Sequence, residues 1–209
     1  MFDTHDLTLF IISGLLLNMA PGPDSLLIMT RSATQGWRAG SAAALGIGAG
    51  TMVHIFAAAF GLSALLATSV TAFSVVKYIG AAYLMYIGAR LLLSKQSDNE
   101  PQAAPLAAPY RNIFLQGFLT NVLNPKIVLF FLAFVPQFIN LDASNKALSF
   151  VVLGLIFNLN GMIWCHLLAV SAAFASARFK IHQRIRLWLN RSIGAAFVSF
   201  GIKLALAKK

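Results

Sequence analysis

Two charged residues follow proline motifs that interrupt otherwise apolar stretches of the sequence. Asp24 comes directly after Pro21-Gly22-Pro23, and Lys126 comes directly after Asn124-Pro125. Because proline lacks a backbone N–H and clashes with the preceding helical turn, each motif predicts a broken helix. An ionisable group at membrane depth is costly and by default indicates an ion or substrate pathway. The alternatives are a helix cap near the interface for Asp24 and a lysine that snorkels to it for Lys126.

Other polar side chains lie in the same apolar stretches. The asparagines are candidates either to satisfy backbone groups freed by the prolines or to bind a substrate's carboxylate or amine. The histidine is a candidate proton relay, because imidazole titrates near neutral pH. With Asp24 and Lys126, they form the predicted substrate or ion pathway: Asn18, His54, Asn121, Asn124 and Asn158.

The composition excludes an ordinary soluble domain. Charged residues make up 11% of the 209 residues and hydrophobic residues 58%, whereas a soluble domain carries about 25% charged residues. A membrane helix needs roughly 20 apolar residues, so six helices would leave no room for a large catalytic domain outside the membrane. No Walker-type loop and no His/Cys cluster with metal-ligand spacing is present. We therefore expect neither an enzyme, nor a cofactor, nor a bound metal.

The apolar stretches predict an all-α membrane protein with six transmembrane helices in one transporter domain. The first repeat would cover about 7–93, a cytoplasmic linker about 94–112, and the second repeat about 113–207. Helices one and four would be the proline-broken ones. The six expected segments are about 7–29, 40–66, 72–93, 113–139, 148–175 and 192–207.

Two pairs of motifs indicate an internal repeat. Gly14-x-x-x-Asn18 is matched by Gly117-x-x-x-Asn121, and Lys77-Tyr78-Ile79-Gly80-Ala81-Ala82-Tyr83 is matched by Arg191-Ser192-Ile193-Gly194-Ala195-Ala196-Phe197. Because each half has three segments, the second half would enter the bilayer from the opposite side, as in many secondary transporters. The alternative is chance similarity between Gly- and Ala-rich segments. We expect glycines at helix contacts, where a missing side chain permits close approach: Gly46, Gly50, Gly80 and Gly194.

The formal charge of +10 is explained by the position of its basic residues. Most of them fall in the loops after segments one, three and five, which the positive-inside rule places in the cytoplasm. Both termini would then be periplasmic. The basic residues are expected to contact membrane lipids, and nucleic acid is not an expected partner. The single cysteine, Cys165, excludes an intramolecular disulfide and is expected to pack.

These motifs together resemble the lysine-exporter (LysE) superfamily, specifically its RhtB-type homoserine/threonine exporters. The matching pieces span nearly the whole chain in the same order and spacing. They are Pro21-Gly22-Pro23-Asp24, the glycine-rich second segment, the motif from Lys77 to Gly88, Asn121-x-x-Asn124-Pro125-Lys126 with Phe130-Phe131, and Pro136-Gln137-Phe138.

The resemblance implies a secondary transporter of the bacterial inner (plasma) membrane that exports amino acids, coupled to proton influx. Its partners would be an amino-acid substrate and protons, and a homo-oligomer stays open. One acid and one base near the breaks favour small neutral substrates of the threonine, homoserine or leucine type. The alternatives are a passive small-solute channel and a cationic amino-acid exporter.

Overall fold

The described residues of the computed structural model are helical throughout, apart from loops and one isolated bridge between Thr4 and Ile139. The structure describes residues 4–62, 107–140 and 143–175, together with isolated positions between 75 and 93 and between 191 and 206. Within these ranges, two single helices and two bent helix pairs are long and apolar enough to cross a membrane. The predicted all-α membrane architecture is confirmed.

The first bent pair consists of α1 (Leu7–Met19) and α2 (Pro23–Gln35), whose axes differ by 56°. Ala20 and Gly22 have extended backbone conformations, and Pro23 opens α2. A proline is tolerated at this first helical position because the N–H it lacks would have no intrahelical acceptor. The predicted break is confirmed, but the segment continues to Gln35, six residues beyond the expected end at Met29.

The second bent pair consists of α6 (Tyr110–Val122) and α7 (Pro125–Leu129), followed by a π-helical turn, η2 (Phe130–Phe134), and a 3-10 turn, η3 (Val135–Phe138). Its bend is 46°. Asn124 caps α7, because its side-chain oxygen accepts a hydrogen bond from the backbone N–H of Lys126 at 3.0 Å. This is the second predicted break, at the predicted place.

The two unbroken spans are α3 and α8. Helix α3 covers Trp37–Ala57 and continues through the π-helical turn η1 (Ala58–Leu62), and α8 covers Lys146–Ala175. Both begin two or three residues before the predicted segments. Predicted segments three and six, with Gly80 and Gly194, lie outside the described residues except for isolated helical positions. At one of these positions Gly201 lies so close to Met85 that an added Cβ would be 2.7 Å from its Cγ.

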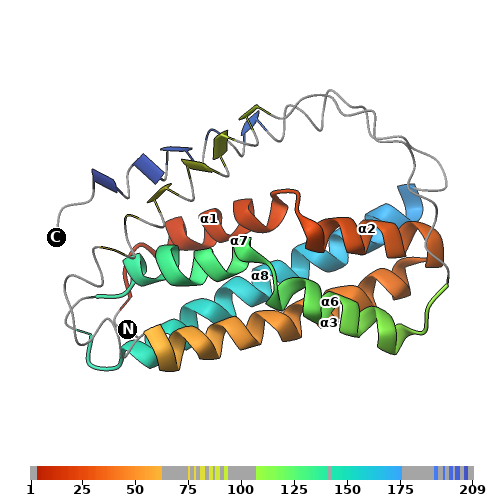
Figure 1. Cartoon of the computed structure of the whole chain (residues 1–209), viewed down its shortest axis with the longest axis horizontal. Helices are drawn as coiled ribbons and strands as arrows, with labels where there is room; N and C mark the ends of the chain where they lie inside the picture. Colours follow the sequence, from red (N-terminus) through yellow and green to blue (C-terminus); the bar gives the residue numbers. More distant parts are fainter. Residues whose placement is uncertain are drawn as a thin grey trace.

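The two bent pairs run in opposite directions. Figure 1 shows α1 and α2 running one way and α6 and α7 running back, with α3 and α8 packed against them. An inverted repeat requires this antiparallel arrangement, although the repeat itself stays a prediction. The last turns of α2 and the first turns of α3 and α6, which carry Arg31, Arg38 and Arg111, lie at one end of the bundle in Figure 1, and the first turn of α8, which carries Lys146, lies at the other. This sorting agrees with the predicted charge asymmetry.

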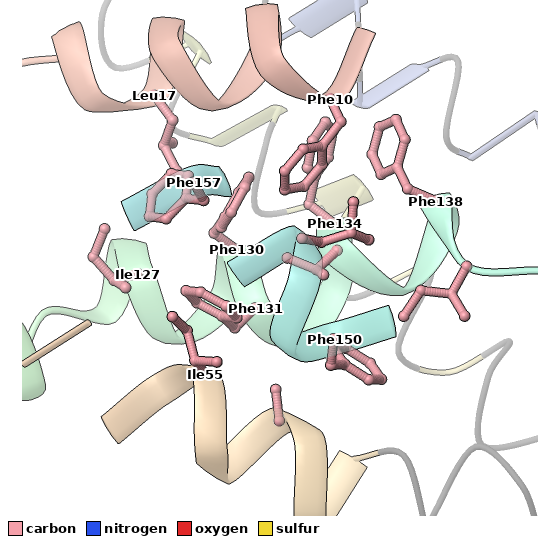
Figure 2. Close-up of a cluster of buried hydrophobic side chains, with 14 of the residues drawn as sticks. Phe10, Leu17, Ile55, Ile127, Phe130, Phe131, Phe134, Phe138, Phe150 and Phe157 are labelled. Atoms are coloured by element: carbon pink, nitrogen blue, oxygen red, sulfur yellow. The ribbon is translucent and has the colours of Figure 1, made fainter. Parts of the chain in front are cut away.

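A cluster of phenylalanines fills the bundle beside the second break. Figure 2 shows rings from α1, the α7–η3 segment and α8 gathered around Phe130, whose ring contacts that of Phe157 with the centroids 4.4 Å apart and the planes tilted by 30°. Phe10, Phe150 and Phe157 are almost completely buried. Large apolar side chains such as Leu26, Leu119 and Leu159 instead face outward and are more than half exposed, as lipid-facing positions of a membrane helix are.

Candidate functional site

The two helix breaks meet inside the bundle, and Asp24 lies at their junction. Its side chain is 8% exposed and occupies the first turn of α2. Carboxylate oxygen Oδ2 accepts hydrogen bonds from Asn121 Nδ2 at 2.9 Å and from Asn124 Nδ2 at 3.1 Å. Both donors belong to the second bent pair, so the acid at the first break is hydrogen-bonded by side-chain amides at the second.

Lys126 reaches in the reverse direction. It is 9% exposed, and its Nζ donates to the backbone oxygens of Leu17 and Ala20, each at 3.1 Å. These carbonyls lie at the C-terminal end of α1, beyond the regular i→i+4 hydrogen bonding of the helix, where the helix dipole favours a cation. Lys126 therefore hydrogen-bonds backbone carbonyls at the first break. In the described structure it forms no direct ion pair with Asp24. Two side-chain amides bind Asp24, and two backbone carbonyls bind Lys126.

Asn121 connects this junction to α3. Its side-chain oxygen lies 3.3 Å from the hydroxyl of Thr51, and its backbone oxygen lies 3.1 Å from His54 Nε2. His54 also stacks on Phe131, with centroids 6.2 Å apart. His54 thus contacts Asn121 and Phe131 on either side of the second break, and it does not line the cavity described below. Thr51 was missed from the sequence, because one threonine among alanines and glycines gives no distinguishing signal.

Glycines allow α3 and α6 to approach closely enough for these bonds. A Cβ on Gly46 would overlap the backbone oxygen of Phe114, and a Cβ on Gly117 would overlap that of Ala43. A Cβ on Gly50 would lie 2.9 Å from the Asn121 Cβ. The packing role predicted for Gly46 and Gly50 agrees with this geometry, and Gly117 contributes from the opposite helix.

A small cavity lies where the breaks cross. Its volume is about 20 Å³, which is room for about one water molecule. Of the predicted pathway residues, Asn18, Asp24, Asn121, Lys126 and Asn158 line it, whereas His54 and Asn124 do not. The lining missed from the sequence includes Ser25, Ile47, Phe157, Met162 and Cys165.

Two polar atoms at this cavity are buried without a hydrogen-bond partner among the described residues. They are Asp24 Oδ1, an acceptor, and Asn18 Nδ2, a donor. Leaving such groups unpaired costs free energy, so native proteins rarely do so without a reason. A free carboxylate oxygen suits an ammonium group, and a free amide N–H suits an anionic oxygen. The two unpaired atoms are therefore chemically complementary to the two charged groups of a zwitterion.

Comparison with known proteins agrees with this chemistry. The family model described as "LysE type translocator" matches residues 15–208. The chain is 29% identical to the leucine efflux protein of Salmonella typhimurium over 94% of its length and 92% of the relative's. It is 33% identical to the uncharacterized membrane protein YrhP of Bacillus subtilis, over 97% of its length and all of the relative's. No solved structure matches.

The match covers both helix breaks and the cavity between them, and it confirms the resemblance to the LysE superfamily seen in the motifs. Proteins of this family are translocators and not enzymes. The chain is a multi-pass membrane protein that belongs to the LysE-type translocator family.

Proposed function

We propose that this protein exports small neutral amino acids from the cytoplasm across the bacterial inner membrane in exchange for protons. The observation that carries the proposal is the cavity at the crossed breaks, with an unpaired carboxylate oxygen on Asp24 and an unpaired amide N–H on Asn18. Similarity to the leucine efflux protein of Salmonella makes leucine the first substrate to test.

The lining of the cavity favours a neutral substrate. Asp24 and Lys126 provide one negative and one positive charge, which match the ammonium and carboxylate of a zwitterion. The side chains of Ile47, Phe157 and Met162 give the rest of the wall an apolar character. A cationic side chain would need a second acid, and the described lining contains only one. An apolar side chain of the leucine type suits this wall better.

The mechanism assigns the exchange of substrate and proton to Asp24. In the cytoplasm-facing state its carboxylate binds the substrate's ammonium, while the substrate's carboxylate faces Lys126, whose ammonium has three donors and uses two on α1. On the outer side, protonation of Asp24 removes the negative charge and releases the amine. Because the closed cavity is far smaller than an amino acid, the two halves must rock apart to load and unload it.

Purified protein in proteoliposomes tests this function. Vesicles with an acidic lumen should accumulate labelled leucine against its gradient, because protons leaving the lumen drive leucine in by antiport. A passive channel would only equilibrate leucine. If no accumulation occurs with leucine, threonine or homoserine under an imposed pH gradient, the proposed exchange is wrong.

The variant Asp24→Asn tests the proton role. It keeps the size of the side chain but cannot take up a proton, so we expect pH-driven accumulation to be lost. Asp6→Asn is the matched control, because Asp6 precedes α1 and its side chain is exposed. Unchanged proton-coupled uptake by Asp24→Asn would contradict the assignment.

A further inference from the structure

Two asparagines at matching positions in the two bent pairs have different surroundings. Asn18 and Asn121 each lie four residues after a glycine, Gly14 or Gly117, near the end of the helix that precedes a break. The amide N–H of Asn121 donates to the Asp24 carboxylate at 2.9 Å. The amide N–H of Asn18 is buried at the cavity and has no acceptor within the described part of the chain.

The charge beside each asparagine explains the difference. Asn121 meets the acid that follows the first break. The residue that follows the second break is Lys126, and its Nζ binds the backbone oxygen of Leu17, the residue directly before Asn18. Asn18 therefore shares the cavity with an ammonium group, and no carboxylate of the described residues lies within hydrogen-bond distance of its free donor. A carboxylate supplied from outside the protein would complete the same amide–carboxylate bond that Asn121 already makes.

We infer that Asn18 binds the α-carboxylate of the transported amino acid and makes the transporter select amino acids over amines. This inference rests on the proposed function and adds a specificity residue to it. The substrate's ammonium then binds Asp24 Oδ1, the other unpaired atom of the cavity. An amino acid satisfies both atoms, whereas an amine leaves the Asn18 donor buried and unpaired.

The size of the effect follows from the bond that is lost. A hydrogen bond to a charged group contributes enough that removing it changes affinity by about 10- to 100-fold. The bond to Asn18 acts only on ligands that carry a carboxylate. Asn18→Ala should therefore weaken leucine by this factor and leave 3-methylbutylamine, which has the same carbon skeleton without the carboxylate, nearly unchanged.

The experiment compares leucine and 3-methylbutylamine as inhibitors of labelled-leucine counterflow into proteoliposomes. The wild type should prefer leucine strongly, and Asn18→Ala should reduce that preference by about 10- to 100-fold. Asn160→Ala is the matched control, because Asn160 on α8 also has a buried amide N–H without a partner among the described residues but does not line the cavity. An unchanged preference in Asn18→Ala would overturn the inference.

A second variant disturbs Asn18 through its neighbour Gly161 on α8. Gly161 faces the Asn18 amide, and an added Cβ would lie 3.3 Å from both Nδ2 and Oδ1. Gly161→Ala should displace the amide and lower the preference for leucine in the same direction, even if Asn18→Ala does not fold. If wild-type protein shows no counterflow of any amino acid, the proposed function fails; if it transports but neither variant changes the preference, only the role of Asn18 fails.

Discussion

The two helix breaks of this transporter share a geometry but differ in chemistry. The first bends by 56° and presents an acid, Asp24, after a glycine that provides no side-chain cap. The second bends by 46° and presents a base, Lys126, after Asn124, which caps the following helix. Each charge is bound by the opposite break: the acid by two amides and the base by two backbone carbonyls.

These reciprocal contacts between the two breaks show how a membrane helix bundle can hold buried charges. A broken helix exposes backbone groups that lipid cannot solvate, so it is tolerated only where protein or a wet cavity covers it. Here backbone carbonyls at the first break bind Lys126, and side-chain amides at the second break bind Asp24. Asp24 also lies at the N-terminus of α2, and the Lys126 ammonium lies at the C-terminal end of α1, which are the favourable helix ends for their charges.

The largest expected loss of stability comes from removing the Lys126 ammonium group. Lys126→Met removes the charged donor from the backbone oxygens of Leu17 and Ala20 and deprives Asp24 of its nearby cation. Leaving the buried Asp24 carboxylate without a compensating cation costs about 3–5 kcal/mol. Thermal unfolding in detergent measures the loss. Lys146→Met is the control, since Lys146 lies at the start of α8, away from the junction. Equal midpoints for the two variants would show that the breaks do not depend on each other.

A smaller loss of stability is expected from substituting Gly117 or Gly14, and the loss should differ between the two. A Cβ on Gly117 would overlap a backbone oxygen of α3, which cannot move easily, whereas a Cβ on Gly14 would lie 3.1 Å from the ring of Phe157, a side chain that can adjust. Gly117→Ala should therefore cost about 1–3 kcal/mol through overpacking, and Gly14→Ala should cost less.

The same unfolding assay compares these two glycine variants. Gly61→Ala is the reference, because nothing in the described structure lies within 4 Å of a Cβ added there. An equal loss of unfolding free energy in Gly14→Ala and Gly117→Ala would mean that the two glycines are packed equally tightly, which would contradict the difference inferred from their neighbours.

The positions of both breaks could be predicted from the sequence because proline acts locally. Pro23 and Pro125 each open the second helix of a pair, as their missing N–H and fixed backbone angle require. Asp24 and Lys126 were recognisable as charges in apolar surroundings. Asn18 and Asn121 were recognisable because their motifs repeat.

The partners of these residues could not be predicted, because they depend on how the helices cross. The two amides at Asp24 and the two carbonyls at Lys126 come from segments about 100 residues away along the chain. Thr51 and His54, the partners of Asn121 on α3, are 70 and 67 residues away from it along the chain. The pathway role of His54 stays a prediction; its ring contacts the backbone oxygen of Asn121 and does not line the cavity. The packing of Gly80 and Gly194 stays a prediction.

The most direct test of the central claim, that the cavity between the breaks is the substrate site, uses the chain's single cysteine. Cys165 lines this cavity and is 9% exposed, so a maleimide reaches it only when the site opens. The rate of its modification in purified protein should fall when leucine is added at concentrations that saturate counterflow, because the occupied cavity excludes the reagent. An unchanged rate at saturating leucine would place the substrate elsewhere and contradict the claim.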